Sequence, residues 1–217
     1  MPPGSASDRS GSPERHAYRV ETGRLTVRCY EPADAEALRA AVASSSEHLL
    51  PWLPWAAAEP QSLDQKIELT RHFRGNFDLG RDFVYAILER DGGGLVGGTG
   101  LHPRCGPGGM EIGYWIRVDR TGRGYATEAS SALVRVAFEL LQLEFVEINC
   151  DPRNVASAAV PAKLGFRQEG LLRARLRWPE GERRDKQVWT LLAADYAASP
   201  CAAAIVEAYD VVGRRLL

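Results

Sequence analysis

A glycine-rich segment between an apolar strand pattern and an amphipathic helix pattern constrains this chain most. Residues 119–129 read Asp-Arg-Thr-Gly-Arg-Gly-Tyr-Ala-Thr-Glu-Ala. The apolar run 110–118 before it predicts a strand, and Ala129, Leu133 and Val136 after it share one helix face. The N–H groups at a helix start lack helical acceptors and lie at the positive end of the helix dipole. The segment predicts a phosphate-binding turn, with a purely structural glycine turn as the alternative.

Known nucleotide motifs fit this segment unequally. The chain has no G-x-x-x-x-G-K-[ST] sequence, so a P-loop is excluded. A dinucleotide fingerprint would use Gly122 and Gly124, but Thr127 stands where its third glycine belongs. Asp151 after the next strand could serve as the ribose-binding acid, which keeps a Rossmann-like oxidoreductase open. Against it, three strands in a meander precede the turn, whereas a Rossmann unit opens with strand, turn and helix.

Size and charge bound the remaining possibilities. The chain has 217 residues and a formal net charge of −1, which fits one main domain and argues against nucleic acid or an anionic membrane as partner. It contains no apolar run long enough to span a membrane and no secretory signal. Isolated cysteines without metal-ligand spacing predict reduced thiols, no metal site and a cytoplasmic location. The basic cluster between residues 173 and 186 is interpreted as a solvated hairpin.

Patterning divides the chain into three parts. Residues 1–20 are rich in Gly, Pro, Ser and charge, and they predict a disordered tail. Residues 21–197 alternate strand and helix patterns and predict an α/β (α+β) domain. Within it, Ser62 and Gln65 have capping-box spacing at the start of a second helix. Residues 198–217 carry apolar residues at spacings of three and four, which predict a C-terminal helical extension packing on the domain or on a second subunit.

A second motif lies just past the strand that follows the glycine-rich turn. Residues 154–166 read Asn-Val-Ala-Ser-Ala-Ala-Val-Pro-Ala-Lys-Leu-Gly-Phe. Together with Glu-Ile-Gly-Tyr-Trp at 111–115, the turn at 122–129 and Leu-Leu-Pro-Trp at 49–52, this segment resembles the GNAT acyltransferase superfamily, more closely its RimJ/RimL-type branch. The resemblance covers residues 23–196. It implies a mixed, mostly antiparallel twisted sheet of about seven strands, with flanking helices and a β-α-β acyl-CoA-binding core.

The resemblance also implies an activity. A protein of this family transfers an acyl group, here expected to be acetyl, from coenzyme A to a primary amine of a protein N-terminus or a small molecule. The pyrophosphate would lie on N–H groups from Gly122 to Ala126, and pantetheine along the preceding strand. Thr121 stands where the family has Gln or Arg, so no side-chain role is expected there. The residues expected to contact acetyl-CoA are Ile116, Arg117, Val118, Gly122, Arg123, Gly124, Tyr125, Ala126, Thr127, Asn154 and Ser157.

Three residues are the catalytic candidates under the same resemblance. Glu111 is expected to act as the general base, directly or through a water, with a solvent-facing strand acid as the alternative. Asn154 corresponds to an asparagine that contacts pantetheine or a water. Ser157 is expected to stabilise the leaving thiolate, because Pro161 stands where many relatives have a tyrosine that acts as general acid. An N–H near Ile116 or Arg117 is expected to hold the developing oxyanion.

Aromatic residues are the candidates for acceptor contact. Trp52, Trp55 and Tyr114 are predicted to line the acceptor side, whereas Trp115 in a central strand is predicted to belong to the core. The absent tyrosine also leaves open a non-catalytic module that binds acyl-CoA. A homo-oligomer is left open too, because the sequence does not decide what the C-terminal residues pack on.

Overall fold

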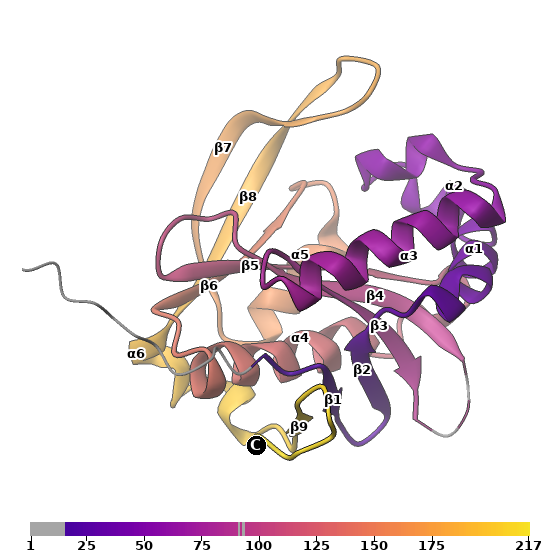
Figure 1. Cartoon of the computed structure of the whole chain (residues 1–217). Coiled ribbons are helices and arrows are strands. Elements are labelled where there is room, and N and C mark those ends of the chain that lie inside the picture. Colours follow the sequence, from indigo (N-terminus) through magenta and orange to yellow (C-terminus); the bar gives the residue numbers. More distant parts are fainter. Residues whose placement is uncertain (1–15, 91, 93) are drawn as a thin grey trace, which may run out of the picture.

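The computed structural model describes residues 16–90, 92 and 94–217. One nine-stranded sheet organises them, in the order β7-β8-β6-β5-β4-β3-β2-β1-β9 (Figure 1). Neighbouring strands pair antiparallel except β5 with β6, which run parallel. The strands are β1 (Arg19–Glu21), β2 (Leu25–Cys29), β3 (Phe83–Glu89), β4 (Leu95–His102), β5 (Gly109–Ile116), β6 (Phe145–Cys150), β7 (Arg167–Arg177), β8 (Arg183–Leu192) and β9 (Glu207–Tyr209).

Helices cover both faces of the sheet. One face packs on α4 and α5 through a large core that includes Ile112, Leu133 and Val160. The other face packs on α1 and α3 through a smaller core around Tyr30 and Leu38. The α-helices are α1 (Ala35–Ala43), α2 (Ser46–Leu49), α3 (Leu63–Asp78), α4 (Tyr125–Arg135), α5 (Val155–Lys163) and α6 (Ala193–Tyr196), with a π-helical turn η4 (Val136–Leu140) ending α4. The 3-10 turns are η1 (Pro32–Asp34), η2 (Pro54–Ala58), η3 (Val118–Arg120) and η5 (Pro200–Ala203).

Local sequence signals explain several of these elements. The capping box predicted at Ser62 is present: Gln65 N–H donates to Ser62 Oγ at 3.2 Å, and Ser62 N–H donates to Gln65 Oε1 at 2.8 Å. In β4, a Cβ on Gly98 would lie 2.5 Å from the indole nitrogen of Trp115, so glycine lets that indole lie flat on the sheet. Trp115 packs against the smaller core, as predicted.

The parallel pair β5–β6 creates the opening that the site uses. Its register pairs Gly109 with Phe145, Met110 with Val146 and Glu111 with Glu147, and no pair follows among the described residues. Residues 112–116 of β5 stay paired with β4 on the other side. The two strands therefore separate after Glu111, and the predicted divergence is confirmed. The loop 117–124 and helix α4 follow directly at the open end.

The two ends of the chain differ from the prediction. The expected helix at residues 198–217 is wrong, because β9 pairs antiparallel with β1 and sets Ala208 opposite Val20. Pairing satisfies the backbone of the β1 edge, and it leaves Ile205 86% exposed, so the apolar spacing of three and four did not mark a buried face. Arg19 and Val20, placed in the tail, belong to β1. Residues 1–15 lie outside the described part. With β1 and β9 the sheet has two strands more than the seven expected.

Candidate active site

The glycine-rich turn has the backbone geometry that an anion site requires. Gly122 and Gly124 have φ values of 73° and 80°, which are left-handed conformations suited to glycine. Helix α4 starts at Tyr125, and its first bond runs from Glu128 N–H to the Gly124 carbonyl at 3.0 Å. The N–H groups of residues 125–127 precede that bond and have no acceptor within the helix. A Cβ on Gly122 would meet no atom within 4 Å, so the space above the turn is open.

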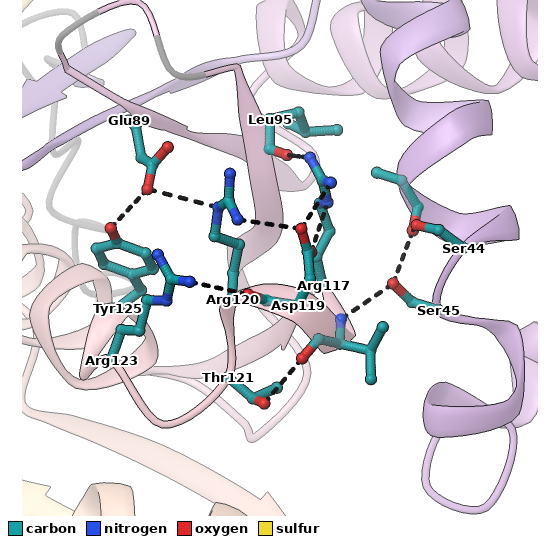
Figure 2. Close-up of polar contacts among 12 residues, drawn as sticks. Ser44, Ser45, Glu89, Leu95, Arg117, Asp119, Arg120, Thr121, Arg123 and Tyr125 are labelled. Atoms are coloured by element: carbon teal, nitrogen blue, oxygen red, sulfur yellow. Dashed lines mark hydrogen bonds and ion pairs between the residues drawn. The ribbon is translucent and has the colours of Figure 1, made fainter.

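Side chains on either side of the turn fix its position (Figure 2). Asp119 binds the guanidinium of Arg117 at 3.1 and 3.0 Å and that of Arg120 at 3.0 Å. Glu89 of β3 accepts from the Tyr125 hydroxyl at 2.6 Å and lies 3.6 Å from Arg120. The charges of these arginines are thereby used within the protein. Arg123 is exposed and donates to the Asp119 carbonyl at 3.3 Å, so the turn can offer an anion this guanidinium as well as its backbone N–H groups.

Two backbone N–H groups next to the turn already have acceptors within the protein. Arg117 N–H donates to the Val96 carbonyl at 2.8 Å. Val118 N–H donates to Ser45 Oγ at 3.1 Å (Figure 2). The prediction that Arg117 N–H could hold an oxyanion is therefore wrong. Backbone groups of an antiparallel strand alternate between its two neighbours. The N–H of Ile116 is therefore directed away from β4, toward the gap beside β6.

Glu111 lies where β5 and β6 separate, as an ionised carboxylate. Its Oε1 accepts from Arg104 at 2.7 Å and its Oε2 from the side-chain amide of Asn149 at 3.0 Å. Burial alone would raise the pKa of Glu111, but the hydrogen bonds and charges of Arg104, Asn149 and Lys186 outweigh it and hold the pKa below its usual value. The side chain is 14% exposed. Glu111 is therefore a buried structural anion as well as a possible proton acceptor.

A cleft of about 530 Å³ opens beside this carboxylate. Its wall is the β7–β8 hairpin, which projects beyond the rest of the sheet (Figure 1). The hairpin tip reaches the α2 end, where Arg184 donates to the Pro51 carbonyl at 2.5 Å and lies 4.0 Å from the ring centroid of Trp178. The lining residues are Arg104, Glu111, Asn149, Leu172, Arg175, Leu176 and Lys186. Of the basic residues expected on a solvated hairpin, Arg175 and Lys186 therefore line this cleft.

Asn154 and Ser157 lie together at the start of α5. Asn154 caps the helix, because its Oδ1 accepts from Ser157 N–H at 3.0 Å. The Tyr114 hydroxyl lies 3.0 Å from both the carbonyl oxygen and the Oγ of Ser157. Burial raises the pKa of Tyr114, with a smaller opposing effect of the hydrogen bond to Ser157. The phenol therefore stays neutral and connects β5 to α5 across the gap.

The aromatic acceptor candidates lie apart from one another. Trp55 is 42% exposed, and its ring packs edge-on against Trp115 with centroids 6.1 Å apart. Tyr114 is next to Trp115 on β5, so its side chain points to the opposite face of the sheet. Its hydroxyl meets Ser157 and not the tryptophan side. Neither Trp52 nor Trp55 lines the cleft beside Glu111.

Several residues that shape the site escaped the sequence-based predictions. Ser45 fixes Val118, and Glu89 fixes Tyr125. Arg24 donates to the Arg123 carbonyl at 3.0 Å and to Glu128 at 2.7 Å. These partners are distant in sequence from the turn that they hold, and no local motif marks them. No local motif marks Asn149 or Arg104, the partners of Glu111, either.

The fold and site have the features expected of an enzyme class that uses a phosphate-bearing donor: open N–H groups at the start of α4 and a gap between β5 and β6. The free N–H groups of the turn and the strand gap fit the pyrophosphate and pantetheine of coenzyme A. Comparison with known proteins gives the family. Residues 24–167 match the acetyltransferase (GNAT) domain model, and the chain belongs to this family of N-acetyltransferases, which use acyl-CoA as the donor.

Individual relatives agree with that assignment. The chain is 35% identical over 171 residues to the putative ribosomal N-acetyltransferase YdaF of Bacillus subtilis, covering 77% of this chain and 91% of the relative. It is 25% identical over 183 residues to the [ribosomal protein uS5]-alanine N-acetyltransferase of Escherichia coli, covering 82% and 92%. Among solved structures, Mycobacterium smegmatis RimJ in complex with CoA-disulfide has a TM-score of 0.74 and 28% identity, covering 87% of this chain and 91% of that one.

The same observations bear on the other expectations. A Rossmann-like oxidoreductase is not favoured, because the sheet has one parallel pair where that fold is built on parallel strands. In the part of the chain that the structure describes, no helix is both long and apolar enough to cross a membrane.

Proposed function

We propose that this enzyme transfers an acetyl group from acetyl-CoA to the α-amino group of a protein N-terminus. One observation carries the proposal: β5 and β6 separate directly after Glu111, with the anion-binding turn at the far end of the gap and the open cleft beside Glu111 at the near end. Donor and acceptor would therefore approach each other from opposite ends of one opening. Relatives named as acetyltransferases of ribosomal proteins support a protein acceptor. Such acceptors are cytoplasmic, and we propose the same location for this enzyme.

Donor binding is assigned to the turn and to β5. Gly122, Arg123 and Gly124, with the first turn of α4 from Tyr125 to Thr127, would offer N–H groups to the pyrophosphate. The apolar side chains of Ile116 and Val118 would line pantetheine beside Arg117. The amide of Asn154 can still donate from its Nδ2, because capping uses only its oxygen.

Chemistry is assigned to three groups around the thioester. The N–H of Ile116, directed into the gap, would donate to the carbonyl oxygen as negative charge develops there. Ser157 would donate a hydrogen bond to the departing sulfur. Glu111 would accept a proton from the attacking amine, directly or through a water, and its lowered pKa makes it a weak base in either case.

The acceptor would enter through the cleft under the hairpin. Leu172 and Leu176 give it apolar surface, and Arg175 and Lys186 give it positive charge. Trp52 and Trp55 would contact residues farther along an acceptor chain, outside this cleft. A folded protein with a free N-terminal segment fits an opening of this kind, since a short extended segment can pass under the hairpin.

A panel of acceptors tests the proposal. Purified protein, acetyl-CoA and thiol detection would compare three classes: peptides with free N-termini, the same peptides with formylated N-termini and one free lysine, and small primary amines. We expect turnover with free N-termini and at least about tenfold lower kcat/KM for the other two. Equal turnover with small amines would refute a protein acceptor. Binding of acetyl-CoA without turnover of any acceptor would refute the enzymatic role.

A further inference from the structure

The first turn of α5 has a backbone carbonyl that lacks its usual helical donor. In an α-helix the N–H of each residue bonds the carbonyl four positions earlier, and Pro161 has no N–H to offer Ser157. Pro161 is buried, and Ser157 is half-buried. An unpaired carbonyl in such surroundings is destabilising. The Tyr114 hydroxyl, 3.0 Å away, is the donor that takes the place of the missing N–H.

This bond determines whether the Tyr114 phenol donates to the Ser157 hydroxyl or accepts from it. A phenol has one hydrogen, and the Ser157 carbonyl takes it because the helix supplies no other donor. The phenol oxygen, 3.0 Å from Ser157 Oγ, is then left as an acceptor for the serine hydrogen. Because the pKa of Tyr114 is raised by burial, this arrangement is the same at every physiological pH.

The position of the pair gives it a role in the reaction. Tyr114 lies on β5 beyond the last β5–β6 pair, and Ser157 lies on the helix that follows β6, so their contact spans the strand gap. When no acetyl-CoA is bound, the Ser157 hydroxyl donates to the neutral phenol oxygen of Tyr114. A charged thiolate is a stronger acceptor than a neutral phenol. The serine hydrogen can turn to the sulfur as charge appears there, while the carbonyl bond keeps the phenol and Ser157 in place.

We propose that Tyr114 is the positioning residue for Ser157, and that Pro161 makes it so by leaving the Ser157 carbonyl to the phenol. The inference rests on the proposed function, in which Ser157 donates to the departing sulfur. It requires no proton transfer from Tyr114. It also assigns Tyr114, expected at the acceptor side, to the donor side of the site.

Paired substitutions separate this role from a merely structural one. Tyr114→Phe removes both contacts of the hydroxyl. We expect kcat to fall about 10- to 100-fold with the KM for acetyl-CoA within about twofold, and Tm to fall by several degrees. Pro161→Ala restores an N–H to the helix. In the Tyr114→Phe, Pro161→Ala double variant we expect Tm to recover to that of Pro161→Ala while kcat stays low, because Ser157 Oγ still lacks the phenol oxygen.

A matched control comes from Tyr85, whose buried hydroxyl donates to the Ala17 carbonyl at 3.0 Å in another part of the core. Tyr85→Phe should lower Tm by a similar amount with unchanged kcat. A second cycle adds Ser157→Ala. If Tyr114 acts through Ser157, Tyr114→Phe should reduce kcat no further in the Ser157→Ala background.

Three results would overturn the inference in an active enzyme. The first is that kcat recovers together with Tm in the Tyr114→Phe, Pro161→Ala double variant. The second is that Tyr114→Phe lowers kcat by the same factor whether or not Ser157 is present. The third is that Tyr114→Phe leaves kcat unchanged. Failure of the proposed function looks different, because the unsubstituted protein would then bind acetyl-CoA without acetylating any acceptor. An intact Tm cycle between Tyr114 and Pro161 would in that case confirm the hydrogen bond and refute its catalytic use.

Discussion

Replacing Gly124 by alanine tests the anion site with the smallest possible change. Gly124 has a φ of 80°, and a Cβ built there would lie 3.6 Å from Arg24, which is ordinary contact. The protein can therefore accommodate the methyl group. The cost to the fold is a left-handed alanine, about 1–2 kcal/mol, offset by about 0.4–1 kcal/mol from the stiffer unfolded chain. At this chain length the difference lowers Tm by at most about 6 °C.

Gly213 supplies the matched control for that cost. It has a φ of 81° in the turn after β9, and a Cβ there would meet no atom within 4 Å. Gly213→Ala should lose the same stability in thermal unfolding without ligand. Only Gly124→Ala should lose affinity for coenzyme A in isothermal titration calorimetry. Displacing the pyrophosphate from one N–H donor removes a charge-assisted hydrogen bond, about 1.5–3 kcal/mol, which is about 10- to 100-fold in Kd.

The outcome that would refute the reasoning is an equal Kd for coenzyme A in the two alanine variants. Gly124→Trp extends the comparison, because an indole at this position fills the space above the turn. That variant should bind no coenzyme A at concentrations that saturate the unsubstituted protein. A Gly124→Trp protein that is folded and still binds with unchanged affinity would remove the pyrophosphate from this turn.

Two further predictions concern residues next to the cofactor and acceptor ends. Ser45→Ala deprives Val118 N–H of its acceptor and should cost about 1–3 kcal/mol in urea denaturation as well as weaken coenzyme A binding, whereas Ser44→Ala, whose hydroxyl bonds within its own helix, should do neither. For Glu111 the folded pKa lies below the unfolded value, so its contribution to stability is present above the unfolded pKa and is lost as pH falls through the folded one. Arg104→Ala leaves burial dominant, and carbon-13 NMR should find the Glu111 pKa moved upward; an unchanged pKa would contradict the assigned cause.

The sequence predicted the parts of the fold that depend on short-range signals. The Ser62 capping box, the glycine turn before α4 and the Asn154 start of α5 each lie within a few residues, and each is present. Strand β9 could not be predicted in this way, because it exists through pairing with β1 at the other end of the chain. The three- and four-residue apolar spacing there resembled a helix, but pairing with an open strand edge decided the outcome.

The candidate site likewise contains residues that the sequence could predict and partners that it could not. Gly124, Asn154 and Ser157 belong to local motifs and could be named from the sequence. The partners that give them their geometry could not. Tyr114 was assigned to the acceptor from its aromatic character, and only the fold brings its hydroxyl to a residue 43 positions away. Likewise, Arg117 N–H was a reasonable oxyanion donor until the register with β4 showed it already bonded to Val96.

The two ends of the gap between β5 and β6 are lined by different chemical groups, and this difference determines what each end can recognise. At the donor end, we expect mainly backbone N–H groups, with the Arg123 side chain beside them, to face the ligand, while Arg117 and Arg120 are bound to Asp119 and Glu89. Such a surface depends little on side-chain identity and suits one constant ligand. At the acceptor end, side chains of the hairpin line the cleft, and its tip is held by contacts such as Arg184 with Pro51. We therefore expect substitutions in the hairpin to change the acceptor without disturbing the donor, which would place acceptor selectivity in β7 and β8.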